Sequence, residues 1–173
     1  MKTIVVFKSK SGFVKKYAIW IAEELAADLL EYSKVTIKEL ESYDTIIYGG
    51  GLYAVGINGI KLITKNLTRL EGRRIVVFAS GATPPRTDDI EKIKNNNFTK
   101  EQLEKLQFFY LRGGFDYKKL NLGDKLLMKL LKWKLKMKKT LMPDEKGMLA
   151  SYTVPVDFTK KKNIEEIILY VNS

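Results

Sequence analysis

The chain has 173 residues, of which 45% are apolar, and it carries a formal net charge of +11. This length and apolar content are typical of one globular domain, which we place over residues 1–173, and the basic charge favours anionic partners. The sequence contains no cysteine and no histidine, which excludes disulfides, thiol nucleophiles, histidine acid–base catalysis and zinc sites built from these residues. If the chain is an enzyme, we expect a bound cofactor to supply the reactivity.

Short apolar runs alternate with helical patterns along the first half of the chain. Runs rich in β-branched residues predict buried strands at residues 2–7, 44–50 and 73–81, and an alternating run predicts an edge strand at residues 34–40. Apolar residues at helical spacing predict helices from Gly12 to about Leu30 and over residues 57–70.

The second half of the chain continues this alternation and adds one long segment that does not fit it. Helices are expected to begin at Asp88 and Lys100, followed by a fifth strand at residues 106–115 and a closing helix at residues 163–171. Residues 116–159 form an insertion before that last helix. Five strands that alternate with helices predict a three-layer α/β fold with a doubly wound parallel sheet, in which ligands bind at the carboxyl ends of the strands.

The loop after the first strand has the composition of a phosphate-binding turn. It leads into a helix, whose first backbone N–H groups and dipole favour an anion. Ser9 and Ser11 add hydroxyl donors, Gly12 permits close approach of the backbone, and Lys10 adds positive charge. A solvated surface turn accounts for the same residues equally well, so this loop alone leaves both interpretations open.

Two further loops, at residues 50–57 and 80–86, leave the carboxyl ends of neighbouring strands. Gly49–Gly51 either forms a flexible connection or leaves bare backbone against which a flat ring can lie, with Tyr53 stacking on the ring. The second of these loops begins with small residues and continues with two prolines. Because the three loops converge on one edge of the sheet, together they favour a ligand-binding site there.

The order of elements and these loops resemble the flavodoxin fold and its FMN site, over residues 2–115 and the final helix. The resemblance implies a strand order of 2-1-3-4-5 and FMN as the cofactor. In that family a Thr/Ser-x-Thr/Ser-Gly-x-Thr pattern holds the FMN phosphate, and residues 9–14 match it except at Val14, which lacks the last hydroxyl. The other two loops would flank the flavin ring. The residues that the resemblance implies for FMN binding are Ser9, Lys10, Ser11, Gly12, Phe13, Val14, Gly50, Gly51, Leu52, Tyr53, Ala54, Ser80, Gly81, Ala82 and Thr83.

The chain also resembles the menaquinone-dependent protoporphyrinogen oxidases, which are small FMN proteins with a long insertion. Three features carry this likeness: an F-x-S-x-x-G start at residues 7–12, the loop GGGLYAVG at residues 49–56, and the lysine-rich insertion FDYKKLNLGDKLLMKLLKWKLKMKK. The resemblance implies an oxidoreductase that passes electrons from a reduced substrate, such as a protoporphyrinogen, to a quinone or protein acceptor. The alternatives are a non-catalytic flavodoxin-type electron carrier and a flavin-free module that binds a membrane or a protein. No acid–base residue is identified, although Arg86 and Arg112 are expected near the site.

The insertion contains a strongly amphipathic helix, expected over residues 123–139. On a helical wheel its apolar face consists of Leu126, Leu130, Trp133 and Met137, extended by Leu127, Leu131 and Leu135, with Lys125, Lys129, Lys132, Lys136 and Lys139 on the opposite face. Four interpretations remain open: packing against the domain, contact with an anionic membrane surface, docking of an acidic redox partner, and pairing of two chains. The lysines are interleaved with leucines rather than with planar stacking residues, which argues against nucleic acid.

The apolar runs of the sequence are short. None approaches the ~20 apolar residues of a membrane-spanning helix, and the run near the N-terminus is too short for the core of a signal peptide. We therefore expect a cytoplasmic protein, which would lie at the inner face of the membrane if the amphipathic helix binds lipid.

Overall fold

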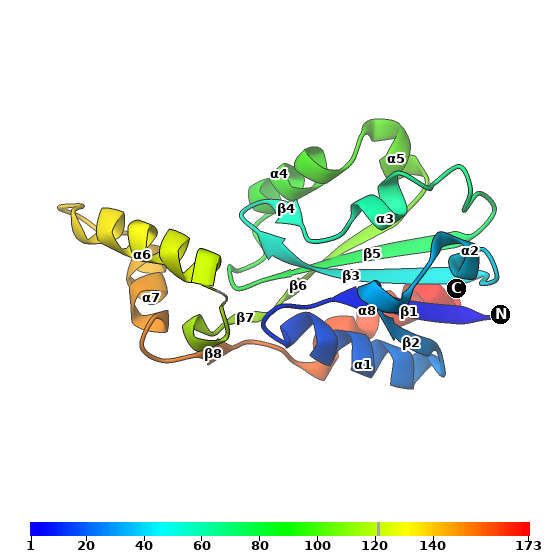
Figure 1. Ribbon diagram of the computed structural model, residues 1–173, viewed down its shortest axis with the longest axis horizontal. Helices are drawn as coiled ribbons and strands as arrows, with labels where there is room; N and C mark the ends of the chain where they lie inside the picture. Colours follow the sequence, from blue (N-terminus) through cyan, green and yellow to red (C-terminus); the bar gives the residue numbers. More distant parts are fainter. Residues whose placement is uncertain (121) are drawn as a thin grey trace.

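The centre of the protein is a parallel sheet with the strand order β2-β1-β3-β5-β6 (Figure 1). The computed structural model describes residues 1–120 and 122–173, but not the side chains of Leu127 and Asp144. The strands of the sheet are β1 (Thr3–Lys8), β2 (Asp28–Glu31), β3 (Thr45–Tyr53), β5 (Arg74–Gly81) and β6 (Gln107–Arg112), and the short β4 (Gly56–Ile57) pairs antiparallel with the end of β3. The predicted order of five parallel strands is therefore confirmed.

Helices cover both faces of this sheet. One face carries α1 (Phe13–Leu25) and α8 (Glu165–Asn172), the latter preceded by the 3-10 helix η3 (Lys161–Ile164), and Tyr17 and Ile167 are buried there. The other face carries α2 (Ile37–Leu40), α3 (Lys61–Thr64), α4 (Thr87–Asn97) and α5 (Lys100–Glu104), and Ile63 and Ile93 are buried there. This arrangement brings the carboxyl ends of β1, β3 and β5 together, at the end of the sheet opposite the chain termini (Figure 1).

The second strand begins earlier in the chain than predicted. Ala26 adopts a left-handed conformation (φ 47°) that ends α1 at Leu25, before the predicted Leu30. The chain can then turn back at once, and β2 pairs in parallel with β1. Alanine is an unusual residue at a left-handed helix end, where glycine is the common choice, so this turn has no clear signal in the residue types.

The prediction of an edge strand at residues 34–40 is wrong. The segment forms the end of a 3-10 turn, η1 (Tyr32–Lys34), followed by the single helical turn α2. The Thr36 hydroxyl accepts a hydrogen bond from the Glu39 N–H (3.3 Å), and Leu40 is fully buried. A capped turn therefore buries the apolar side chain that the strand prediction had assigned to one face of a sheet.

Two other predicted elements are shorter than expected. Within residues 57–70 only α3 is an α-helix, although Ile60, Ile63, Leu67 and Leu70 are all buried. The predicted strand at residues 106–115 is divided, because β6 ends at Arg112 and, after Gly113, the chain forms β7 (Gly114–Phe115), which pairs antiparallel with β8 (Val156–Asp157). The chain thus leaves the main sheet just before the insertion.

The insertion forms an arm beyond the carboxyl ends of the strands (Figure 1). It contains η2 (Tyr117–Lys119), α6 (Leu122–Lys136) and α7 (Pro143–Ser151). The Tyr152 hydroxyl donates a hydrogen bond to the Met128 carbonyl (2.7 Å), and the Tyr117 hydroxyl donates one to the Lys125 carbonyl (3.4 Å). These bonds attach α6 to its neighbours, and the predicted amphipathic helix is confirmed up to residue 136.

Apolar residues occupy two opposite faces of α6. The inner face includes the half-buried Met128 and Leu131 and the buried Leu135, whereas the side chains on the outer face are exposed. The predicted single apolar face, extended through Leu131 and Leu135 with lysines opposite, is therefore wrong, because the face opposite the exposed residues is itself apolar. Leu127, which the prediction also included, lies outside the described side chains.

Candidate functional site

The loop after β1 leads into α1 without a side-chain cap. Gly12 is the N-cap residue in a left-handed conformation (φ 94°), and within residues 1–120 and 122–173 no side chain caps this helix and no acidic residue lies in its first turn. The Gly12 N–H donates a hydrogen bond to Ser9 Oγ (3.0 Å), which closes the turn. The N-terminus of α1, with its positive dipole end, is therefore arranged as a site for an anion such as a phosphate.

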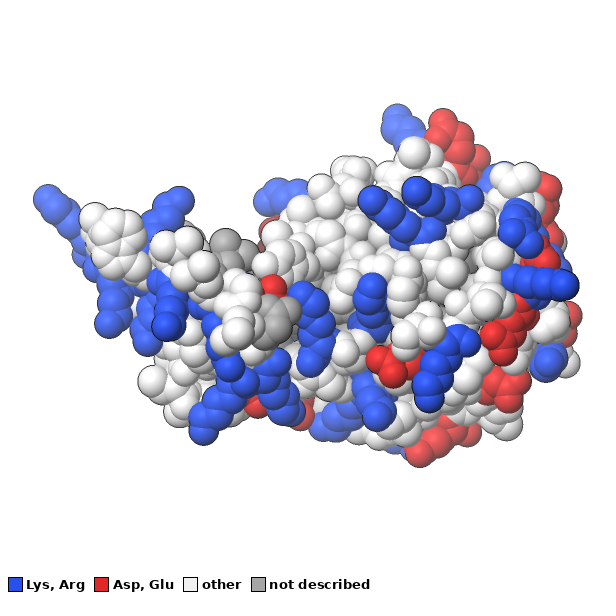
Figure 2. Space-filling model, viewed as in Figure 1, with Lys and Arg blue, Asp and Glu red and all other residues white. Residues whose placement is uncertain are grey.

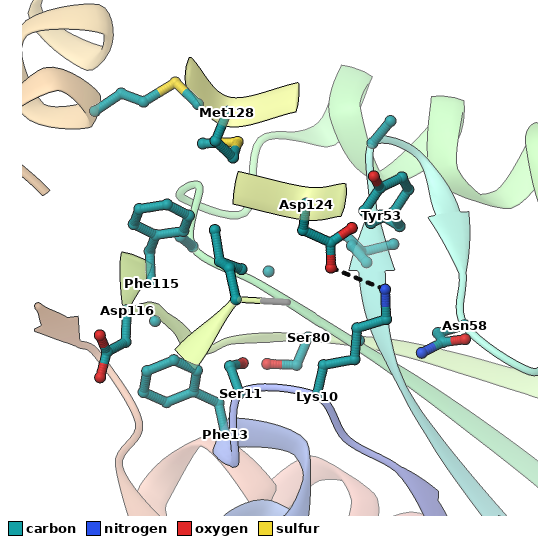
Figure 3. Close-up of a pocket in the computed structure, with 18 of the residues that line it drawn as sticks. Lys10, Ser11, Phe13, Tyr53, Asn58, Ser80, Phe115, Asp116, Asp124 and Met128 are labelled. Atoms are coloured by element: carbon teal, nitrogen blue, oxygen red, sulfur yellow. Dashed lines mark hydrogen bonds and ion pairs between the residues drawn. The ribbon is translucent and has the colours of Figure 1, made fainter. Parts of the chain in front are cut away.

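A cavity of about 600 Å³ lies beside this loop (Figure 3). The loop after β1, the ends of β3 and β5, and the insertion all contribute to its largely apolar wall. The predicted site residues that line it are Lys10, Ser11, Phe13, Val14, Gly51, Leu52, Tyr53, Ala54, Ser80, Gly81 and Ala82. The three loops thus meet at one edge of the sheet, and the volume is in the range that small-molecule and cofactor sites occupy.

Four predicted residues do not line the cavity: Ser9, Gly12, Gly50 and Thr83. Ser9 and Gly12 shape the turn before α1. A Cβ atom at Gly50 would lie 2.5 Å from Ile57 Cγ2, so glycine at this position permits β4 to pack on β3. The Thr83 hydroxyl lies 3.2 Å from the Tyr110 hydroxyl. These residues support the loops rather than form the wall.

Ser80 places an unpartnered hydroxyl at the cavity. The residue is 6% exposed, and among the described residues its Oγ atom has no hydrogen-bond partner although it is buried. A buried hydroxyl without a partner costs about 1–3 kcal/mol. Ser80 also lines the cavity, and its buried Oγ atom lies against Gly113, so a hydrogen bond from this hydroxyl to a ligand requires a small local shift.

An ion pair joins the loop after β1 to the insertion (Figure 3). Lys10 Nζ lies 2.9 Å from Asp124 Oδ2, and the Asp124 side chain is 9% exposed. A hydrogen bond with the Asp124 carboxylate raises the pKa of Tyr53, and partial burial raises it further. Lys10 Nζ also lies 4.9 Å from the centroid of the Tyr53 ring. These three residues, which are distant in sequence, form one side of the cavity.

Sequence reasoning missed the remainder of the wall. These residues are Asn58, Gly114, Phe115, Asp116, Leu120, Asp124, Met128, Leu130, Leu131, Lys134 and Met148. Phe115, together with Phe13, adds aromatic rings to a site for which only Tyr53 was expected as a stacking residue. One signal was present in the sequence: residues 122–139 contain seven lysines and one acidic residue, Asp124. An isolated acid in such a segment is a candidate for a specific ion pair.

The two arginines expected near the site lie outside the cavity wall. Arg112 Nε donates a hydrogen bond to the Ala82 carbonyl (3.3 Å), and its guanidinium lies 3.7 Å from the centroid of the Phe158 ring. Arg86 is the N-cap residue of α4. The Arg112 side chain therefore belongs to the framework around the loop rather than to the cavity wall.

Comparison with known proteins agrees with this architecture. The model of the flavodoxin domain family matches residues 4–141. The chain is similar to a WrbA-like flavodoxin from Agrobacterium tumefaciens, with 16% identity and a TM-score of 0.50 over 71% of this chain and 87% of that one. It is also similar to a flavodoxin from the domain Archaea, with 18% identity and a TM-score of 0.46 over 76% of this chain and 93% of that one. No curated protein sequence matches the chain.

Proposed function

The chain belongs to the flavodoxin domain family, with FMN as its cofactor, and from this premise we propose that it is an oxidoreductase that passes electrons from a reduced substrate to a quinone. The observation that carries the proposal is the cavity, which lies between the insertion and the three loops at residues 9–14, 50–57 and 80–86, here called the FMN loops. The cavity extends past these loops to Phe115, Met128 and Met148. A shuttle that donates only to proteins has no need of an apolar chamber beside its flavin.

The residues of the site fit FMN. The uncapped N-terminus of α1, with Ser11 and the turn closed by Ser9, would hold the phosphate. The unpartnered hydroxyl of Ser80 would bond a polar atom at the rim of the ring, and Tyr53 supplies an aromatic face on the other loop. When bound, FMN supplies reversible transfer of electrons, and the protein supplies binding, orientation and exclusion of water.

The apolar part of the wall favours an apolar substrate and acceptor. In the overall reaction the donor loses two electrons and two protons, and a quinone gains both and becomes a quinol. Protoporphyrinogen is the specific donor that the sequence resemblance suggests, and its pyrrole rings are compatible with a wall built from Phe115, Met128 and Leu131. The reaction would take place in the cytoplasm, with the quinone reached at the inner face of the membrane.

A non-catalytic electron carrier is the second candidate. The observation that favours it is the lysine-rich arm beside the site, because lysines attract an acidic redox protein and increase the rate of encounter. In this case the cavity would hold only the flavin ring.

Anaerobic stopped-flow kinetics with the FMN-loaded, reduced protein separates the two candidates. The enzyme proposal predicts that a water-soluble naphthoquinone reoxidises the flavin directly, and that Leu131→Trp, which fills the cavity beyond the FMN loops, slows this reaction at least tenfold without loss of FMN. Leu169→Trp on the exposed side of α8 is the matched control. Reoxidation that requires an acidic protein acceptor would instead establish the carrier.

A further inference from the structure

The outer face of α6 carries a continuous row of exposed apolar side chains. It consists of Leu122, Leu126, Leu130, Trp133 and Met137, which are 57–86% exposed. Their spacing of three or four residues places them on one stripe along the helix and its last turn. We call these five residues the outer stripe.

The outer stripe is not an incompletely packed core face. The contacts of α6 with the rest of the protein are made by the opposite face, where Leu135 and Asp124 are buried and Asp124 pairs with Lys10. The Tyr152 hydroxyl is bonded to the Met128 carbonyl on the same side of the helix. The helix is therefore attached through one apolar face and presents the other to its surroundings.

Lysines flank the outer stripe on both sides. Residues 122–139 contain seven lysines, and their one acidic residue, Asp124, is buried and paired. On the wheel Lys129 and Lys136 lie along one flank of the stripe and Lys134 along the other. Lys138, just beyond α6, pairs instead with Glu145 of α7. Figure 2 shows blue side chains along both edges of the projecting arm, with white residues between them. The charges that flank the stripe on α6 itself are therefore positive.

We propose that the outer stripe binds the surface of an anionic lipid bilayer, with α6 lying in the plane of the interface. An interfacial helix combines a large apolar face, flanking lysines and a tryptophan at the level of the headgroups, and α6 has all three. An acidic protein would complement the lysines but not an unbroken apolar row along a helix of ~22 Å. Among the described residues no helix is long and apolar enough to cross a membrane, so α6 binds at the surface.

This placement gives the cavity direct access to the lipid. Leu130 belongs to the outer stripe and also lines the cavity. Lys134, one turn further along the helix, lies outside the stripe but lines the cavity as well. The outer stripe and the cavity wall therefore share Leu130. The inference rests on the proposed function in one respect: a quinone dissolved in the membrane can then reach the site without crossing water.

Vesicle co-sedimentation of the FMN-loaded protein tests the proposal. Binding is expected with phosphatidylglycerol/phosphatidylcholine vesicles and at least tenfold weaker with phosphatidylcholine alone. Leu126→Ser and Trp133→Ser should each weaken binding roughly tenfold, whereas Leu169→Ser, at an equally exposed leucine of α8, should leave it unchanged. In a Trp20→Phe background the fluorescence of Trp133 should shift to the blue on binding.

Charge reversal supplies a second, independent comparison. Lys129→Glu, Lys136→Glu and Lys139→Glu together should abolish binding to anionic vesicles, and the same reversal at Lys34, Lys65 and Lys105, which are exposed elsewhere on the domain, should reduce it much less. Equal binding to neutral and anionic vesicles would overturn the proposal. So would a dimer in sedimentation velocity that dissociates on Trp133→Ser, because the stripe would then be an interface between two chains.

The two proposals fail separately. The reaction of the reduced protein with a water-soluble naphthoquinone does not require lipid, and Leu126 and Trp133 lie outside the cavity wall. If vesicles do not bind while this reaction is fast, only the proposal that α6 binds a membrane is refuted. If vesicles bind while the reaction is absent, the proposal of electron transfer to a quinone is refuted and the proposal of membrane binding stands.

Discussion

Replacement of Ser80 by alanine should stabilise the FMN-free protein and weaken its binding of FMN. The buried, unpartnered hydroxyl of Ser80 costs about 1–3 kcal/mol in the absence of a ligand. Its removal is therefore expected to raise the free energy of unfolding of the FMN-free protein by about 1 kcal/mol, or the melting temperature by roughly 2–4 °C for a chain of this size. If the same hydroxyl bonds FMN, loss of about 1 kcal/mol of binding energy raises the Kd roughly fivefold.

Ser151→Ala is the matched control for this experiment. Ser151 is as buried as Ser80, but its hydroxyl donates a hydrogen bond to the Met148 carbonyl (2.7 Å). Its replacement should destabilise the protein by about 1 kcal/mol and leave the Kd for FMN unchanged. Urea unfolding of the FMN-free variants and flavin fluorescence titration measure the two quantities. Ser80 has no such role if Ser80→Ala destabilises the FMN-free protein as Ser151→Ala does, or if the Kd of this variant for FMN equals that of the wild type.

Three further predictions concern the framework of the site. Gly49→Ala would place a Cβ atom 2.1 Å from Phe78 Cζ and should lower the free energy of unfolding by about 1–3 kcal/mol; urea unfolding that matches the wild type would contradict this packing. In Gly12→Ala the added Cβ atom meets no heavy atom within 4 Å, but the alanine must adopt a φ of +94°. The substitution should therefore lower the free energy of unfolding by about 1–2 kcal/mol and also weaken FMN binding. Unchanged FMN affinity in isothermal titration would argue against the phosphate role of this turn. The Asp28 carboxylate, which accepts a hydrogen bond from the Tyr43 hydroxyl (2.7 Å), is the main cause that raises the pKa of Tyr43 to about 12 from its usual 10.0. The stabilisation is therefore fully present below pH 10 and lost as the pH rises through 12, so the stability difference between wild type and Tyr43→Phe, about 1–2 kcal/mol, should close over that interval; a difference independent of pH would contradict the assignment.

The sheet could be predicted from the sequence because each of its buried strands is a short run of β-branched residues that can be recognised locally. The β-branched runs at residues 2–7 and 73–81 form buried strands wherever helices cover both faces, and their alternation with helices leaves few possible topologies. The second strand was misplaced because Ala26, rather than a glycine, adopts the left-handed turn that ends α1. Val35 and Ile37 alternate as in a strand, whereas Ile37 and Leu40 are spaced as in one helical turn, and tertiary packing decides between the two structures.

The candidate site could be predicted only in part, because half of its wall depends on contacts between distant segments of the chain. Its three loops follow strands whose order the sequence indicates, so the convergence of these loops could be predicted. The other half of the wall comes from the insertion, and contacts such as Lys10 with Asp124 span more than one hundred residues of sequence. The wheel of α6 also could not show which of two apolar faces packs inward, because residue type alone does not distinguish Leu135, which is buried, from Leu126, which is exposed.

The most direct test of the account compares FMN with riboflavin as ligands of the purified, FMN-free protein. The cavity and the uncapped N-terminus of α1 predict that one FMN binds per chain, and that riboflavin, which lacks the phosphate, binds at least one hundredfold more weakly. Ser11→Ala with Lys10→Met should reduce this discrimination. Equal affinity for the two flavins would contradict the assignment of the loop at residues 9–14 as the phosphate site, and failure to take up FMN would contradict the redox function as well.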